Sequence, residues 1–321
     1  MASNSISVVM SVYNGIAYLH EAVESILNQT FRDFEFIIID DGSVDGTTDL
    51  LRKYAESDSR IRLVTQEKIG LTKSLNRGLS MASGEFIARM DPDDIALPDR
   101  FEKQMAMFQN DPSLVLLGCE VGLIDEAGRL YGKRGHAQCH TEIRRRLLAG
   151  DGGALTHPAI MFRSGAAQAI GGYDEKMPTA QDLDFYLKLS EVGVVANLKE
   201  TLLLWRQHSG SVNHTKSQTW AEMRRYCVGK TIQRIGVQQF LEQFFLPTTH
   251  SPDSRAIDKA RIASKSGLYR EAFGFYWTAF KSKDQRGAAV YQFTEMVMNL
   301  LHQSVFRFIR AFSNPLSQKS K

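Results

Sequence analysis

Three carboxylates stand within four positions, at Asp91, Asp93 and Asp94, directly after an apolar run. Carboxylates this close repel one another, so they stay ionised together at low cost only where water or a cation shares their charge. A divalent metal site and a capped, solvated turn explain the cluster equally well from this stretch alone. A calcium loop of the EF-hand type is excluded, because Ile95 and Ala96 stand where that loop needs an oxygen ligand and a glycine.

A second acidic pair, Asp40 and Asp41, ends the apolar run at 34–39. Mg²⁺ and Mn²⁺ are typically held by one or two carboxylates together with substrate phosphates, so a nucleoside diphosphate is the simplest ligand for the two clusters. Other motifs fail. The Gly-Lys-Thr at 229–231 lacks the first glycine of a P-loop, and no G-x-G-x-x-G follows the first expected strand. A G-x-S-x-G nucleophile elbow is also absent from the sequence.

The acidic clusters belong to an alternation of short apolar strands and amphipathic helices. The pattern predicts strands at 6–12, 34–39, 61–65 and 85–90, and helices at 16–27, 46–57 and 71–81. Asn14 is expected to cap the first helix. This alternation is typical of a doubly wound α/β sheet with helices on both faces. Such sheets bind ligands beyond the carboxyl ends of their strands, which is where Ser11, Asp41 and Asp91 fall.

The rest of the chain changes character twice. From about 113 to 215 the pattern is mixed, with strands expected at 114–117 and 159–162, a turn at 125–128, a helix at 182–192, and apolar runs at 194–198 and 202–205. After about 216, long helical patterns dominate. The sequence therefore predicts two domains: an α/β domain at 1–215 and an all-helical C-terminal region at 216–321.

Two parts of the helical region leave alternatives open. The spacing of small and aromatic residues at 260–279 resembles one tetratricopeptide hairpin, but a single copy cannot form a solenoid, so we expect a hairpin packed on the main domain. The segment at 287–312 is amphipathic and basic. It can lie in a membrane interface, or bury one face against its own protein.

Composition excludes several classes of protein. Apolar residues at 43% and charged residues at 23% are ordinary globular values. The net charge of +3 is too small to indicate a nucleic-acid partner. The three cysteines show no C-x-x-C spacing, so neither a disulfide framework nor a zinc site is suggested. With no basic leader and no apolar run near the ~18 residues that span a bilayer, we expect a cytoplasmic protein, attached at most to the inner face of the cell membrane.

Seven blocks of the sequence resemble family-two glycosyltransferases, in the order seen in that family. They are SVVMSVYN, IIDDGSVDGT, GLTKSLNRG, ARMDPDD, HPAIMFR, GGYDE and AQDLDF. The resemblance covers about residues 5 to 215, and seven ordered blocks are far more specific than any one. It implies a GT-A fold with a mixed sheet, a nucleotide-sugar donor, Mn²⁺ or Mg²⁺ as cofactor, and inversion at the anomeric carbon.

Carried over to this chain, the resemblance assigns nucleotide contacts to residues in the first four blocks. They are Ser11, Tyr13, Asp40, Asp41, Lys73 and Asp91. Asp41 would recognise the base, and Asp91 would support the ribose or phosphate side. Asp93 would be the metal ligand of the Asp-x-Asp element. Related sequences carry an Arg-x-His like the one that ends at His208, which is a further candidate metal ligand, with an ordinary hydrogen bond as the alternative.

The late acidic motif of the family, commonly Glu-Asp, appears here as Gln181-Asp182. The resemblance therefore makes Asp182 the candidate general base. In an inverting transfer the base takes the proton of the acceptor hydroxyl while its oxygen attacks the face opposite the leaving diphosphate. An N-cap of the helix at 182–192 is the alternative role, and the two roles are compatible. Because Gln181 stands where the family commonly has a glutamate, the sequence offers no candidate for a second acidic contact to the acceptor.

The resulting hypothesis is an inverting, metal-dependent glycosyltransferase. It would move a sugar from a nucleotide-diphosphate sugar, expected to be a UDP-sugar, to a glycan or lipid-linked acceptor in cell-surface polysaccharide synthesis. A nucleotidyltransferase is one rival, but it needs a glycine-rich, lysine-containing loop that residues 12–15 do not offer. A non-catalytic scaffold that binds nucleotide sugars is another, and the intact acidic elements argue against it.

Overall fold

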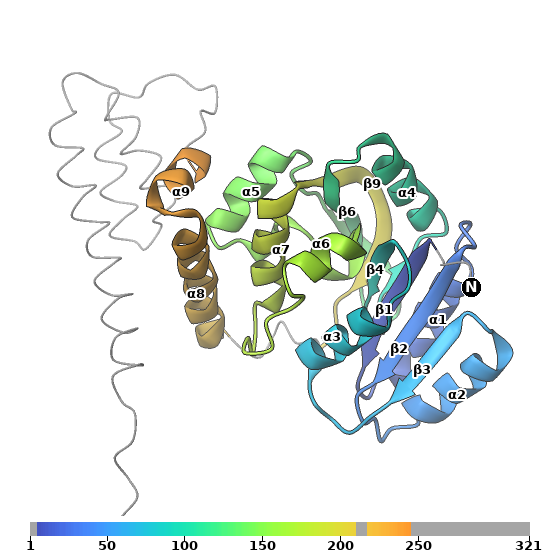
Figure 1. Cartoon of the computed structure of the whole chain (residues 1–321). Coiled ribbons are helices and arrows are strands. Elements are labelled where there is room, and N and C mark those ends of the chain that lie inside the picture. Colours follow the sequence, from blue (N-terminus) through green and yellow to red (C-terminus); the bar gives the residue numbers. More distant parts are fainter. Residues whose placement is uncertain (1–4, 210–216, 245–321) are drawn as a thin grey trace, which may run out of the picture. The chain divides into compact units, whose positions relative to one another are not determined.

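The computed structural model describes residues 5–209 and 217–244 (Figure 1). The chain divides into two compact units, at 1–240 and 241–321. Of the second unit, only residues 241–244 are described. The predicted hairpin at 260–279 and the amphipathic helix at 287–312, with its membrane contact, lie outside the described residues. Among the residues that are described, no helix is long and apolar enough to cross a membrane.

Strands and helices alternate through the first half, as the sequence predicts. The strands are β1 Ile6–Val12, β2 Phe34–Asp40, β3 Ile61–Thr65, β4 Phe86–Met90, β5 Ile95–Ala96, β6 Leu114–Ile124, β7 Leu130–Arg134, β8 Met161–Arg163 and β9 Val194–Arg206. The α-helices are α1 Ile16–Leu27, α2 Thr47–Ser57, α3 Leu71–Met81, α4 Arg100–Asn110, α5 His140–Leu148, α6 Ser164–Ala169, α7 Gln181–Val192, α8 Ser217–Ile235 and α9 Val237–Phe244. Two short 3-10 helices lie at Gly152–Ala154 and His157–Ala159.

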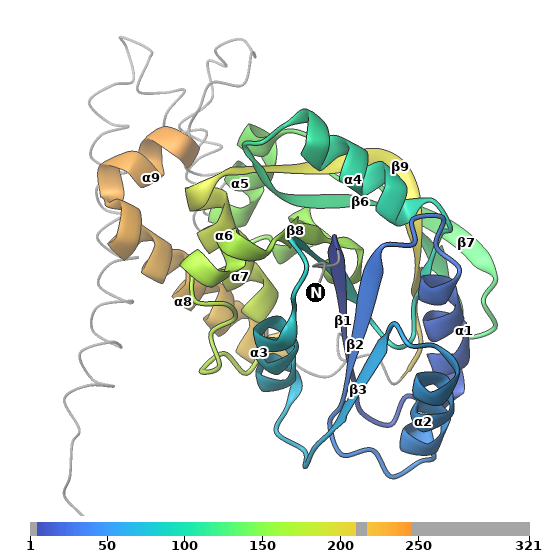
Figure 2. The ribbon, with the colours of Figure 1, turned by 45° about the vertical axis from the view of Figure 1, so that its right-hand side comes forward.

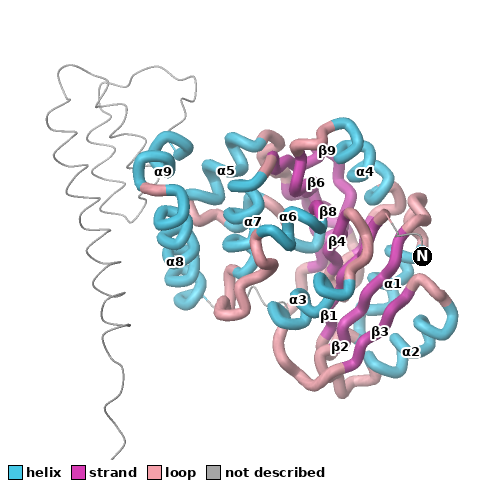
Figure 3. Tube along the Cα trace, viewed as in Figure 1, coloured by secondary structure: helices cyan, strands magenta, loops and turns pink. Residues whose placement is uncertain are grey.

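All of these strands join one mixed sheet (Figure 3). Its order is β3-β2-β1-β4-β8-β6-β9-β5, with β7 paired to β6. The first four strands of this order run parallel, whereas β8 is antiparallel to both β4 and β6. β6 and β9 pair in parallel. The predicted α/β class with a mixed, doubly wound sheet is confirmed.

Helices cover both faces of the sheet because successive strand residues point to opposite sides. Val8 and Met10 face one side and share a core with Leu19 and Val23 of α1 and with α2 and α4. Val9 faces the other side, where Gly78 brings α3 so close that a Cβ atom there would lie 2.5 Å from a methyl carbon of Val9. Figure 2 shows α1 and α2 on one side of β1 to β3 and α3 on the other.

One strand is longer than predicted, and one prediction about a helix end is wrong. The strand expected at 114–117 extends to Ile124 as β6, and the apolar runs at 194–198 and 202–205 lie in one strand, β9, which pairs with it. Asn14 does not cap α1, because the N-cap residue of this helix is Gly15, which makes no side-chain cap hydrogen bond. Instead the Asn14 side chain accepts a hydrogen bond from the backbone of Val44, in the loop after β2.

Candidate active site

The carboxyl ends of β1, β2 and β4 meet at one edge of the sheet. Val12 lies opposite Asp40 in the register of β1 and β2, and Met10 lies opposite Met90 in that of β1 and β4. Because the three strands are parallel, the segments that follow them leave the sheet on the same side. The two acidic clusters therefore border one site.

Asp41 organises the loop between β3 and α3. Its carboxylate is buried and accepts hydrogen bonds from the backbone N–H groups of Ile69 and Gly70 and from the Gln66 side chain, each at 2.8 Å. Burial alone would raise the pKa of Asp41, but these hydrogen bonds outweigh it and lower the pKa. Asp41 is thus held ionised, with its orientation fixed before any ligand binds.

Asp40 is turned inward. One carboxylate oxygen accepts from the backbone N–H of Ser43 at 3.0 Å, and the other accepts from the hydroxyl of Thr48. The same loop is tied to the segment after β1, because the Gly15 N–H donates to the Thr47 hydroxyl at 3.0 Å. Asp40 therefore shapes the loop that follows β2, and its contact with the nucleotide stays a prediction.

Three other predicted nucleotide residues lie at the end of β1 and at the start of α3. Ser11 is buried near the end of β1, and Tyr13, two residues further on, is 43% exposed. Lys73 is exposed in the first turn of α3. Sequence reasoning missed Lys68, whose ammonium lies 3.5 Å from the centroid of the Tyr13 ring. An aromatic ring with a cation on its face suits a planar, anionic ligand, and no motif marks Lys68 in advance.

The carboxylates that follow β4 form a compact cluster. Asp91, Asp93 and Asp94 each offer an oxygen, and these oxygens lie within 4.8 Å of one another. Asp91 forms an ion pair with the buried guanidinium of Arg89. One oxygen of Asp94 accepts the backbone N–H of Arg206 at 2.9 Å, and its other oxygen is buried with no hydrogen-bond partner in the described part of the chain.

This cluster fits a divalent cation. Burial raises the pKa of Asp91 and of Asp94, and the charge of Asp93 raises both further. Such carboxylates need either protons or a positive charge to offset their repulsion. Three hard oxygen donors, one of them buried without a partner, are the ligands that Mg²⁺ or Mn²⁺ prefers. Asp93 and Asp94 would hold the ion, with Asp91 beside them.

His208, which the sequence analysis names as a further candidate metal ligand, lies next to this acidic cluster. Its Nε2 is 2.9 Å from an oxygen of Asp93. Its ring packs on Tyr18 of α1, with the ring centroids 5.1 Å apart. The position is therefore compatible with both roles left open by the sequence, a metal ligand and a hydrogen-bonding partner of Asp93.

Arg206, the first residue of the Arg-x-His segment, contacts other parts of the protein itself. Its guanidinium is only 1% exposed and donates to the backbone carbonyls of Asp93, Asp125 and Glu126. It also pairs with Glu21 of α1 at 2.6 Å. Arg206 thus braces the acidic loop, the β6–β7 turn and α1 against one another. Because its guanidinium is buried against these groups, it is not accessible to a phosphate.

Asp182 lies in the first turn of α7. The N-cap residue of this helix is Ala180, in a left-handed conformation with φ 57°, so Asp182 is not the N-cap. One of its oxygens accepts the backbone N–H of Leu183 at 2.8 Å. A Cβ atom at Gly152 would lie 3.9 Å from either carboxylate oxygen, so the absence of a side chain there leaves room beside the base. Burial raises the pKa of Asp182, which suits a group that takes a proton.

Arg89 of β4 is the second site residue that sequence reasoning missed. It is 4% exposed, and its ion pair with Asp91 raises its pKa against the effect of burial. Burial lowers the pKa of His157 and the charge of Arg89 lowers it further, whereas at Asp182 burial raises the pKa and the charge of Arg89 opposes it only in part. His157 in turn hydrogen-bonds the Tyr173 hydroxyl at 2.8 Å. A charged residue inside an otherwise apolar strand was the signal that could have found it.

Fold and site together define a class of protein. The solved structure of S. aureus TarS in complex with UDP-GlcNAc has a similar fold, with a TM-score of 0.64 over 91% of this chain and 81% of that chain, at 18% sequence identity. The chain is thus an α/β protein of the GT-A type. The family model for glycosyl transferase family 2 matches residues 7–171, just over half of the 321 residues, and the chain belongs to that family.

Relatives of known name agree with this membership. The chain is 33% identical over 241 residues to the O-antigen biosynthesis glycosyltransferase WbnJ of Escherichia coli, covering 74% of this chain and 92% of that protein. It is 28% identical over 239 residues to the amylovoran biosynthesis glycosyltransferase AmsE of Erwinia amylovora, covering 72% of this chain and 87% of that protein. The protein is therefore a transferase, as the sequence predicts.

Proposed function

We propose that this protein is an inverting, metal-dependent glycosyltransferase that passes a sugar from a UDP-sugar to a glycan or lipid-linked acceptor. Residues 1–215 would form the catalytic domain, working on the cytoplasmic side of the membrane in cell-surface polysaccharide synthesis. Two observations support the finer points. WbnJ and AmsE are named for polysaccharide synthesis, and TarS was solved with UDP-GlcNAc.

The donor would bind along the sheet edge. Asp41, ionised and fixed by its loop, would accept the imide N–H of uracil, while Tyr13 and Lys68 would lie against the nucleotide. Lys73 of the first turn of α3 would add charge for the phosphates. Uracil presents an N–H between two carbonyl groups, so a preoriented carboxylate is a suitable acceptor for it.

The diphosphate would lie at the acidic cluster. Asp93 and Asp94 would hold Mn²⁺ or Mg²⁺, with His208 as a further ligand or as the partner of Asp93. Bound there, the ion would stabilise the charge that develops on the leaving diphosphate. Arg89 would keep Asp91 ionised and oriented beside it.

Asp182 would act as the general base. It would take the proton of the acceptor hydroxyl as the acceptor oxygen forms its bond to the anomeric carbon, and the bond from that carbon to the diphosphate would break on the opposite face. The single observation that carries this proposal is the cluster of Asp91, Asp93 and Asp94, whose oxygens lie within 4.8 Å of one another, with one buried oxygen of Asp94 left without a hydrogen-bond partner in the described part of the chain.

A panel of nucleotide sugars tests the proposal on purified protein. We expect release of UDP from at least one UDP-sugar when Mn²⁺ is present, and faster release when a suitable acceptor is added. Asp182→Asn should lower transfer by about 10²- to 10⁴-fold, the usual contribution of a general base. It should leave the donor-induced rise in the thermal midpoint unchanged. Asp49→Asn, an exposed aspartate on α2, is the matched control.

Three outcomes would count against the proposal. Full transfer activity in Asp182→Asn would remove the assigned base. Release of pyrophosphate from a nucleoside triphosphate would favour a nucleotidyltransferase instead. Tight binding of nucleotide sugars without turnover, across a broad panel of donors and acceptors, would favour the scaffold.

A further inference from the structure

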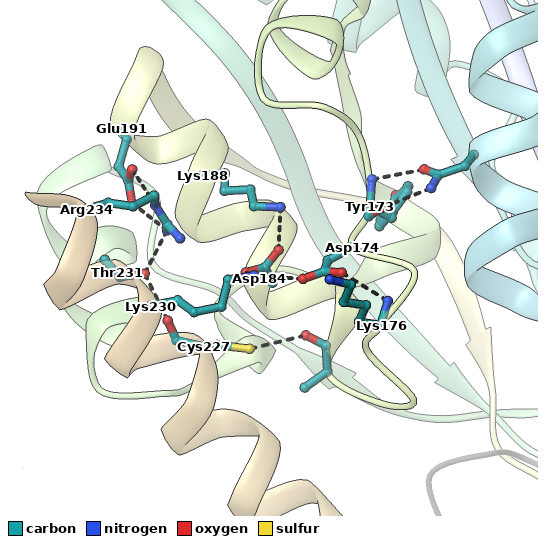
Figure 4. A network of polar contacts seen from close by, with 12 residues as sticks. Tyr173, Asp174, Lys176, Asp184, Lys188, Glu191, Cys227, Lys230, Thr231 and Arg234 are labelled. Carbon is teal, nitrogen blue, oxygen red and sulfur yellow. Dashed lines mark hydrogen bonds and ion pairs between the residues drawn. The ribbon is translucent and has the colours of Figure 1, made fainter. Parts of the chain in front are cut away.

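Helix α8 lies beyond the residues that the family model matches, yet it is firmly attached to α7 (Figure 4). Lys230 pairs with Asp184 of α7 at 3.3 Å and with Asp174 at 2.7 Å. Arg234 makes two hydrogen bonds to Glu191, near the other end of α7, at 2.8 and 3.0 Å. Since α7 carries the proposed base in its first turn, these contacts fix α8 relative to the reaction centre.

Arg224 lies on α8 almost two turns before Lys230, beside the loop that borders the base. A Cβ atom at Gly150 of that loop would lie 3.6 Å from the Cβ of Arg224. Its guanidinium lies 5.2 Å from the ring centroid of Trp220, one turn earlier. The Nε–H of Arg224 is shielded from water and has no hydrogen-bond partner in the described part of the chain.

Further cations line the same loop. Arg146 donates its Nε–H to Asp151 at 2.8 Å, and Arg134 donates to a backbone carbonyl of the loop at 3.0 Å. The loop reaches the base through Gly152, where a Cβ atom would lie 3.9 Å from the Asp182 oxygens. Together with Arg224, these guanidiniums outnumber the one carboxylate of the loop, so this side of the base is electropositive.

We propose that Arg224 and Trp220 form an acceptor subsite for an acidic group, a phosphate or a carboxylate carried next to the accepting hydroxyl. A planar guanidinium fork matches either anion with two parallel hydrogen bonds, and the indole offers an apolar face to a sugar ring. The subsite rests on the proposed function, because it lies on the acceptor side only if Asp182 is the base. It assigns substrate recognition to a helix outside the predicted catalytic domain.

Ligand titrations followed by tryptophan fluorescence test the subsite without turnover. UDP and Mn²⁺ are kept saturating to occupy the donor side, and glucose 1-phosphate, glucuronate and glucose are compared. We expect both anionic ligands to bind wild-type protein about 10- to 100-fold more tightly than glucose, as charge-assisted hydrogen bonds predict. The phosphate and carboxylate arms show which acidic group is preferred. In Arg224→Gln the preference should disappear, and Arg224→Lys should keep part of it.

Arg225→Gln is the matched control, because it removes the same charge from the next residue, whose exposed side chain donates to the Ala221 carbonyl. Equal binding of glucose and both anions by wild-type protein would overturn the subsite, and so would an equal loss of anion preference in Arg225→Gln. Donor hydrolysis by the same preparations separates this inference from the proposed function. Hydrolysis of a nucleotide sugar without any preference for the anionic ligands would refute the subsite alone. A preference for the anionic ligands without turnover of any nucleotide sugar would refute the transferase assignment.

Discussion

Replacing Arg206 with methionine removes the buried brace of the site while keeping its aliphatic bulk. The guanidinium donates to the carbonyls of Asp93, Asp125 and Glu126, besides pairing with Glu21. A hydrogen bond from a charged donor contributes about 1.5 to 3 kcal/mol when it is shielded from water. Water can replace part of what is lost at the partly exposed turn. We therefore expect Arg206→Met to lower the free energy of unfolding by about 3 to 5 kcal/mol.

Thermal unfolding measures this loss, which corresponds to a fall of roughly 6 to 20 °C in the midpoint for a unit of this size. Glu21→Gln is the control, because it removes only the charge of the ion-pair partner. Glu21 is 52% exposed, so its ion pair is worth about 0 to 1 kcal/mol and the variant should stay near wild-type stability. If the two variants lost equal stability, or if Arg206→Met cost less than about 1 kcal/mol, the backbone carbonyls would not be what Arg206 holds.

Three further outcomes follow from the electrostatics of the protein, two of them at the site and one at Glu35 near the start of β2. Because burial raises the pKa of Asp182, transfer should increase with pH through a midpoint above the usual carboxyl range, and Arg224→Gln should move that midpoint higher, which a pH–rate profile measures. At Glu35, burial raises the pKa of the carboxyl group, but hydrogen bonds outweigh burial and lower the pKa from 4.5 to about 2. The ionised Glu35 carboxylate should therefore contribute about 3 kcal/mol to the free energy of unfolding above pH 4.5, and this contribution should vanish toward pH 2. The loss of stability caused by Glu35→Gln, measured by urea unfolding, should shrink over that interval. With UDP present, Mn²⁺ should raise the thermal midpoint of wild-type protein, and Asp93→Asn should lose this rise while keeping the response to UDP alone.

The part of the site that lies at strand ends could be predicted from the sequence. An apolar run long enough for a buried strand, followed by aspartates, places those aspartates at the ligand edge of a parallel sheet without any knowledge of long-range contacts. Asp41 and the cluster at 91–94 follow this rule, and the register of β1, β2 and β4 brings their segments together. The helices needed only the local periodicity of their apolar residues.

The buried arginines could not be predicted in the same way. Arg206 and its partner Glu21 are 185 positions apart. No local sequence pattern predicts that a guanidinium at the end of an apolar run is enclosed by the acidic loop, the β6–β7 turn and α1. Asn14 illustrates the same limit on a smaller scale. Its sequence context favours a helix cap, but a loop thirty residues further on competes for its side chain and wins.

The acidic residues of this site divide into two groups by how their charge is compensated, and the division itself indicates where ligands act. Asp40 and Asp41 have their charge satisfied by hydrogen bonds from their own loops, so they are oriented before a ligand arrives. Burial raises the pKa of Asp91, Asp94 and Asp182, so their ionised forms are costly until a cation or a transferred proton compensates them. Replacing a buried, incompletely compensated carboxylate by an apolar group often stabilises a protein, so carboxylates of this kind at a ligand edge favour a functional role. The second group is therefore where the metal ion and the proton transfer are expected. The first group shapes the loops that receive the nucleotide, and Asp41 is oriented there in advance as the proposed acceptor for uracil.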